Sequence, residues 1–87
     1  MPAHLFDSRP NTNLAYHVDA AKNEYFGDAP RGAKTTDSVW RIYVIWYVTP
    51  GDQTSSWQIL YPDGSDNPAY RWSNVENYTY SLLAKRA

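Results

Sequence analysis

The chain of 87 residues has no cysteine, and this absence removes several kinds of chemistry. Without thiols there can be no disulfide framework, no thiolate metal site and no thiol nucleophile. Histidine is almost as scarce, since His4 and His17 are the only two, and their spacing matches no metal-binding pattern such as H-E-x-x-H. We therefore expect neither a metal centre nor a bound cofactor.

An excess of charge of one sign is also missing. Eight Lys and Arg residues are balanced by nine Asp and Glu residues, which gives a net charge of −1 and a sequence pI of about 6.0. A chain without a basic field attracts neither nucleic acid nor an acidic membrane surface. We expect no nucleic-acid partner and no membrane partner.

Long hydrophobic runs are absent as well. The longest apolar run, residues 39–48, has ten residues, whereas a membrane-spanning helix needs about 20. No N-terminal segment joins a basic region to an apolar one, so the sequence predicts no signal peptide. A mean hydropathy of −0.67 agrees with a soluble protein.

The chain is rich in aromatic residues, with four Trp, eight Tyr and two Phe. A chain this short forms one domain and buries only about 60–65% of its unfolded surface. Aromatic side chains, which bury about 150–250 Å² each, can make a core of that size sufficient. We divide the chain into an extended arm (residues 1–13), a β domain (14–83) and a polar tail (84–87).

Strand-like alternation begins at Leu14, because Leu14, Tyr16 and Val18 share one face at period 2. We predict a hairpin with its turn over residues 20–23. A helix over residues 19–26 is the alternative, since Asp19 could cap it. Residues 27–38 follow as a loop punctuated by glycine and proline.

Turn signals divide the rest of the domain into further strands. Pro50 followed by Gly51 suits a type II turn after a long strand over residues 38–49. Pro62 and Gly64 suit a type I turn after a returning strand. Residues 69–72 and 77–83 read as two more strands. Five or six strands and no confident helix predict an all-β fold, a small antiparallel β sandwich or barrel.

The strand "VWRIYVIWYV" (residues 39–48) is apolar on both faces, which a half-buried strand should not be. One face is wholly apolar and should form the core; it carries Trp40, Ile42, Val44, Trp46 and Val48. The other face carries Val39, Arg41, Tyr43, Ile45 and Tyr47. Three interpretations remain open for it: cover by the chain itself, an exposed aromatic strip, or contact with another protein. Tyr, Trp and Arg are enriched at interface cores, which favours contact. The interface residues predicted are Leu5, Phe6, Arg41, Tyr43, Ile45 and Tyr47.

No catalytic pattern emerges from the sequence, because no G-x-S-x-G and no phosphate-binding glycine loop occur. We expect no catalytic residues and no enzyme. Aromatic rings beside Asp and Asn are also the residue types that bind sugars. A possible glycan-binding set comprises Tyr61, Asp63, Asp66, Asn67, Tyr70 and Trp72. The alternative is that these rings belong to the core or to an interface.

Several segments together resemble a pattern found in small virion proteins of tailed bacteriophages. The pattern runs aromatic-x-Gly-x-Ala-Pro-x-Gly, a Thr/Ser-rich link, Val-Trp-x-Ile, Tyr-x-Asp-Gly, a Trp and Tyr-Thr-Tyr-Ser. Its positions in this chain are residues 26–32, 35–38, 39–42, 61–64, Trp72 and 78–81. The chain departs from the pattern after Asn74, where the family often has an Arg.

The resemblance, which covers about residues 25–81, implies a structural role in a phage particle and supplies no catalytic residues. It implies that the partners are other virion proteins, contacted in many copies or as a homo-oligomer. Head decoration is preferred over a tail or fibre adaptor. The expected location is the virion, assembled in the host cytoplasm. A small carbohydrate-binding module for host recognition is the alternative function.

Overall fold

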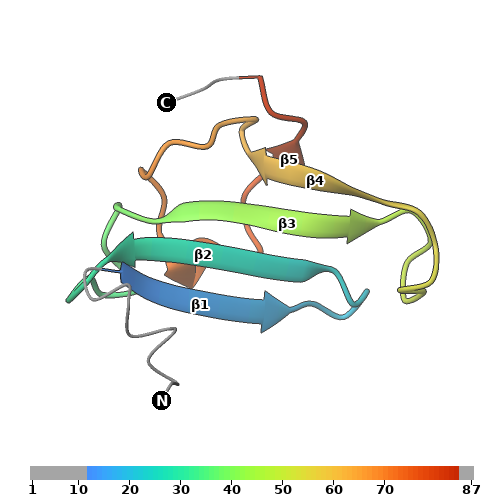
Figure 1. Ribbon diagram of the computed structural model, residues 1–87, viewed down its shortest axis with the longest axis horizontal. Helices are drawn as coiled ribbons and strands as arrows, with labels where there is room; N and C mark the ends of the chain where they lie inside the picture. Colours follow the sequence, from blue (N-terminus) through green and yellow to red (C-terminus); the bar gives the residue numbers. More distant parts are fainter. Residues whose placement is uncertain (1–11, 85–87) are drawn as a thin grey trace, which may run out of the picture.

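The computed structural model describes residues 12–84, which form one antiparallel sheet covered on one side by irregular chain (Figure 1). The strands have the same order in the sheet as in the chain, β1-β2-β3-β4-β5. Their bounds are β1 (Thr12–Val18), β2 (Glu24–Pro30), β3 (Arg41–Tyr47), β4 (Trp57–Pro62) and β5 (Tyr80–Ser81), with one 3-10 helix, η1 (Trp72–Asn74). The prediction of an all-β, antiparallel fold of five to six strands is confirmed.

The hairpin between β1 and β2 is built around the carboxylate of Asp19. Its Oδ1 accepts hydrogen bonds from the backbone N–H groups of Ala21 (2.9 Å) and Asn23 (3.0 Å). Lys22 completes the turn with a φ of +66°. The predicted hairpin is therefore confirmed and the alternative helix is wrong, because the positive φ of Lys22 reverses the chain and Asp19 N donates to Asn23 O across the turn.

Strand β2 continues through Gly27 to Pro30, four residues that the sequence assigned to a loop. That boundary prediction is wrong. Gly27 does not mark the end of the strand, as the sequence suggested. It lies in the middle of β2 because the ring of Trp72 occupies the space that a side chain would need. Ala29 is buried beyond it, so the alternation of β2 reaches its last residues.

Both predicted turns close where expected, but only one has the expected type. Asp52 N donates to Thr49 O (3.0 Å) and Gly51 has a φ of +80°, as in a type II turn. After β4, Gly64 N donates to Tyr61 O (3.0 Å). Asp63 there has a φ of +52°, so the predicted type I turn is wrong. Aspartate tolerates this left-handed conformation better than most residues do.

The segment between β4 and β5 forms the second layer of the domain. It passes behind the sheet in Figure 1, and it carries η1 and Val75 over β2 and β3. We call this side of the sheet the covered face and the other side the open face. The buried core lies between the layers and consists of Tyr25, Ala29, Trp40, Ile42, Val44, Leu60 and Val75.

The covering layer stops before the end of β3. Ile42 and Val44 are completely buried, but Trp46 is 36% exposed and Val48 is 65% exposed. The prediction that all five even-numbered residues of this run form the core is therefore wrong at its far end. The predicted strand over residues 69–72 is reduced to a single bridge between Tyr70 and Trp40.

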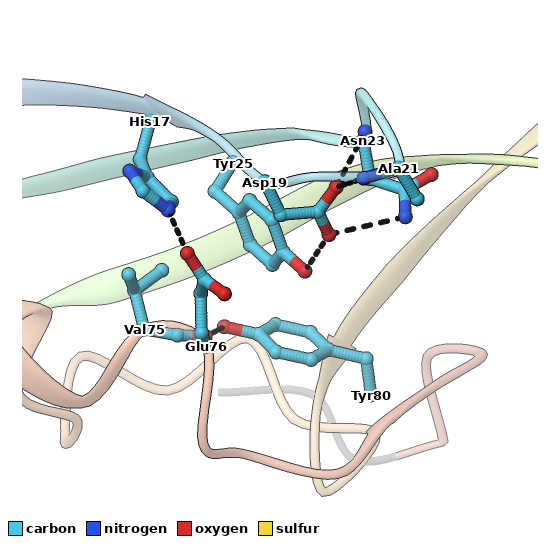
Figure 2. A network of polar contacts seen from close by, with 8 residues as sticks. All are labelled: His17, Asp19, Ala21, Asn23, Tyr25, Val75, Glu76 and Tyr80. Atoms are coloured by element: carbon cyan, nitrogen blue, oxygen red, sulfur yellow. Dashed lines mark hydrogen bonds and ion pairs between the residues drawn. The ribbon is translucent and has the colours of Figure 1, made fainter. Parts of the chain in front are cut away.

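Polar contacts fasten the covering layer to the first hairpin (Figure 2). His17 of β1 contacts the carboxylate of Glu76, which belongs to the covering segment. The Tyr80 hydroxyl donates to the Val75 carbonyl, and the Tyr80 ring packs edge-on against Tyr25. Burial is the main cause that raises the pKa of both tyrosines above the ordinary value.

Candidate functional site: the open face of the sheet

A row of four aromatic rings crosses the open face, one from each of the first four strands. Tyr16 and Phe26 are directly opposite each other, as are Phe26 and Tyr43. The ring centroids are 5.2 Å apart for Tyr16 and Phe26, and 5.1 Å apart for Phe26 and Tyr43. Tyr61 extends the row to β4, with its ring 6.3 Å from that of Tyr43. We call these four residues the aromatic row.

A mixed row and a charged pair lie on either side of the aromatic row. The mixed row runs from Val18 through Glu24 and Ile45 to Ile59, and Val18 and Ile59 remain about 40% exposed. On the other side, Arg41 Nε lies 3.6 Å from Asp28 Oδ1. This ion pair is largely solvent-exposed, so it adds little stability and can reorganise towards a partner.

The Glu24 carboxylate receives two tyrosine hydroxyls on the open face. Tyr16 donates to Oε1 (3.2 Å) and Tyr47 donates to Oε2 (2.6 Å). The hydrogen bond to Glu24 is the main cause that raises the pKa of Tyr47. For Tyr16, burial is the main cause of the raised pKa and the hydrogen bond to Glu24 is the second. Glu24 thus holds two rings in fixed positions.

A hollow of about 400 Å³ opens beside the aromatic row, over β1, β2 and β3. Its lining comprises Leu14, Ala15, Tyr16, Phe26, Gly27, Asp28 and Tyr43. The hollow is therefore mainly apolar and has one carboxylate at its margin. No segment of residues 12–84 covers it, since the covering layer lies on the opposite side of the sheet.

Three of the predicted interface residues, Arg41, Tyr43 and Ile45, lie on the open face. Tyr47 lies on the same face but is only 9% exposed. The loop between β3 and β4 closes over this end of the sheet, where Gln53 Nε2 donates to the Lys22 carbonyl (3.2 Å). Tyr47 is therefore not an accessible contact residue, and it supports the open face from beneath this loop. Leu5 and Phe6 lie outside the described residues.

The predicted glycan-binding set does not gather on one surface. Tyr61 belongs to the open face, whereas Trp72 packs on Trp40 in the covering layer with ring centroids 5.8 Å apart. Tyr70 packs edge-on against Tyr78, also in the covering layer. The polar members Asp63, Asp66 and Asn67 follow β4 in the loop. The set is therefore divided between the two sides of the sheet, because the chain crosses from one face to the other between Tyr61 and Trp72.

Sequence reasoning missed Tyr16, Phe26 and Trp57 as members of the site. The alternation predicts that Tyr16 shares a face with Leu14 and Val18, but no pattern shows which strand lies beside it. The pairing of Tyr16 with Phe26 depends on the register of the first hairpin. Trp57, which is 57% exposed, stands opposite Tyr47 at the far end of the face.

Residues 12–84 meet neither the requirements of a metal site nor those of a membrane-spanning helix. No group of three or more His, Cys, Asp and Glu in this range is placed to hold a metal ion. His17 Nε2 is engaged by the carboxylate of Glu76. The same range contains no helix with the length and apolar character that crossing a membrane requires.

Comparison of the chain with protein-family models, curated proteins and solved structures finds no match. The fold and the open face therefore define the protein only as an all-β domain with an aromatic sheet face that residues 12–84 leave uncovered.

Proposed function

We propose that the chain is a non-enzymatic structural protein of a tailed-phage particle, and that its open face binds a neighbouring virion protein. The observation that carries the proposal is the aromatic row, which spans four strands without any cover from the described chain. Tyr16 is 59% exposed and the other three rings are partly exposed. Soluble monomers seldom leave a large apolar patch in contact with solvent. The open face has the composition of an interface core, with tyrosine rings inside and a charged pair at the rim.

The orientation of the rings favours a protein partner over a sugar. Phe26 and Tyr43 are stacked with their planes only 19° apart, so each ring covers a face of the other. A sugar needs an exposed ring face on which to lie, whereas a protein side chain can pack against ring edges and between rings. The matching surface on the partner is an apolar patch with its own charged groups opposite Asp28 and Arg41.

The phage setting of this proposal rests on the resemblance of residues 25–81 to small virion proteins. Within that setting we propose head decoration in preference to a tail or fibre adaptor, with many copies per particle. The protein would join the particle during assembly in the host cytoplasm. A repeated structural protein of this kind needs a firm, pre-ordered contact surface, which the Glu24 hydrogen bonds to Tyr16 and Tyr47 provide.

The test begins with mass spectrometry of purified particles of the phage that encodes the chain, in which the chain should be a stoichiometric component. Particles lacking it are then incubated with purified chain carrying Tyr16→Ser and Tyr43→Ser. Binding should fall at least tenfold. The matched control carries Trp46→Ser and Val48→Ser, which remove exposed apolar groups at and just after the end of β3, away from the aromatic row, and it should bind normally. Absence from particles, or equal loss in both variants, contradicts the proposal.

A carbohydrate-binding module is the second candidate, and the hollow beside the aromatic row is the observation that favours it. The Asp28 carboxylate at its margin could accept hydrogen bonds from sugar hydroxyl groups. This candidate predicts a change in intrinsic fluorescence on adding a glycan, and loss of that change in Asp28→Asn. A flat response across a broad glycan panel rejects it.

A further inference from the structure

Strand β1 forms an outer edge of the sheet, with no described segment beyond it (Figure 1). Asp19 N donates to Asn23 O, which shows which residue pairs of the first hairpin are hydrogen-bonded. Because hydrogen-bonded pairs alternate along an antiparallel pair, the backbone N–H and C=O groups of residues 13, 15 and 17 point towards β2. The backbone N–H and C=O groups of Leu14, Tyr16 and Val18 therefore point outward, and none of them has a backbone partner within residues 12–84.

The opposite edge of the sheet offers less free backbone. Strand β5 pairs with the last two residues of β4, Tyr61 and Pro62, and a hydrogen bond from Asp63 N to Thr79 O extends this pairing. Only the first part of β4 is left open. Strand β1, with seven residues, is the longest unpaired edge that the described chain presents.

Strand β1 also lacks the features that usually protect an edge. Natural edge strands are shielded by proline, by lysine or other charged side chains, or by a bulge. The sequence of β1, "TNLAYHV", has no proline and no Asp, Glu, Lys or Arg. Its pairing with β2 is regular over all seven residues. Two copies of β1 can approach each other without repulsion between like charges.

We propose that β1 pairs antiparallel with β1 of a second copy of this chain, about a twofold axis at Ala15. Ala15 is the middle residue of the strand, so this register pairs all seven residues. Leu14 then lies opposite the partner's Tyr16, and the outward backbone groups of each meet those of the other. An antiparallel pair of identical strands is closed by its own symmetry, so the assembly stops at a dimer.

The dimer would join the two sheets into one of ten strands with a single continuous open face. Leu14 and Tyr16, which are 56% and 59% exposed in the single chain, would be covered by their symmetry mates. The two aromatic rows would then meet end to end across the joint, offset by two residues along β1. This inference deepens the proposed function and rests on it for the role of the dimer, but the dimer itself can be tested without any phage component.

The absence of cysteine makes a cross-linking test possible. In the proposed register the two Ala15 residues form a non-hydrogen-bonded pair, whose Cα atoms lie about 4.5 Å apart. That separation is within the range of a disulfide bond. Ala15→Cys in the full chain should form a disulfide-linked dimer under mild oxidation. Thr36→Cys, in the exposed loop before β3, is the control and should remain largely monomeric.

Light scattering of the full chain from about 5 µM to about 500 µM provides a second, independent measurement. We expect a monomer–dimer equilibrium. Leu14→Lys should weaken dimerisation at least tenfold, because it places a charge at the paired edge. Ile59→Lys places the same charge on the open face, far from that edge, and should leave the dimer intact while impairing binding to particles.

Other occupants of the edge give different results. A monomer at every concentration, with no excess cross-linking of Ala15→Cys, overturns the proposal. A dimer that appears only when residues 1–11 are deleted also overturns it, since those residues would then hold the edge in the full chain. Larger polymers without the Ala15 cross-link would mean that β1 pairs with the opposite sheet edge of another copy, and this result also overturns the proposal. A normal dimer that fails to join particles leaves this inference standing and rejects the proposed function.

Discussion

The ring of Trp72 lies directly over Gly27, at the place where a side chain on that residue would have to go. A Cβ atom built on Gly27 would be 2.6 Å from Trp72 Cε3, closer than carbon atoms can pack. This contact fixes where the covering layer meets β2. It also explains why a glycine occupies the middle of a strand, where glycine is otherwise unfavourable.

Gly27→Ala should therefore destabilise the domain by about 1–3 kcal/mol, the usual range for overpacking. The measurement is urea unfolding followed by tryptophan fluorescence and circular dichroism. Trp72→Leu provides the control background, because a smaller side chain leaves room for the added methyl group. An equal cost of Gly27→Ala in both backgrounds would show that the contact with Trp72 is not responsible.

The turn built on Asp19 should make the stability of the domain depend on pH at the acid end. Burial acts to raise the pKa of this carboxyl, but hydrogen bonds from Tyr25, Asn23 and Ala21 outweigh it and lower the pKa below 3.8. A group whose pKa is lowered by folding stabilises the native state above its unfolded pKa. That contribution is lost as the pH falls through the folded pKa.

Asp19→Asn should cost about 0.5–1.5 kcal/mol at neutral pH, a modest value because solvent screens the carboxylate. The difference in unfolding free energy between the two proteins should shrink steadily as the pH falls from about 5 to about 2. Chemical denaturation at a series of pH values measures it. A difference that stays constant over this range would mean that the charge of Asp19 has no part in the turn.

The Glu24 carboxylate should control how two tyrosines ionise. Its hydrogen bonds help to raise the pKa of Tyr16 and of Tyr47 above 10.0. Such groups stabilise the fold fully below pH 10, and that stabilisation is lost as the pH rises through their folded pKa values. Glu24→Gln should therefore shift the tyrosinate absorbance titration to lower pH. Asp63→Asn, at an exposed turn, should leave the titration unchanged, and a shift of the same size there would refute the assignment.

Two valines of the same apolar run should respond very differently to truncation. Val44 is completely buried, so Val44→Ala should cost about 2 kcal/mol from lost burial and an unfilled cavity. Val48 is 65% exposed, and Val48→Ala should change the unfolding free energy by less than about 0.5 kcal/mol. Matched urea titrations of the two variants are sufficient. Similar costs would show that the covering layer extends past the end of β3.

The local parts of this fold follow directly from local sequence. The alternation of Leu14, Tyr16 and Val18 predicts β1 because successive side chains of a strand point to opposite faces. The Pro50–Gly51 pair predicts its turn because proline fixes φ and glycine permits a positive φ. Each of these features depends on the conformation of only a few consecutive residues.

For the candidate site, local alternation predicts which residues share a surface but not which of them stay exposed. The split of residues 39–48 into an apolar face and a tyrosine face predicts that Arg41, Tyr43 and Ile45 share a surface, and they do. It fails at Trp46 and Val48, because alternation says which side a residue faces but not how far a distant segment extends over that side.

Local sequence is enough to predict the class of fold, the first hairpin and a strand with two unlike apolar faces. The tertiary structure sets which face stays open, because that depends on the path of the segment between β4 and β5 across the sheet. It also decides the register that places Tyr16, Phe26, Tyr43 and Tyr61 in one row. Burial and register arise from contacts between residues far apart in the chain, and no short stretch of sequence records them.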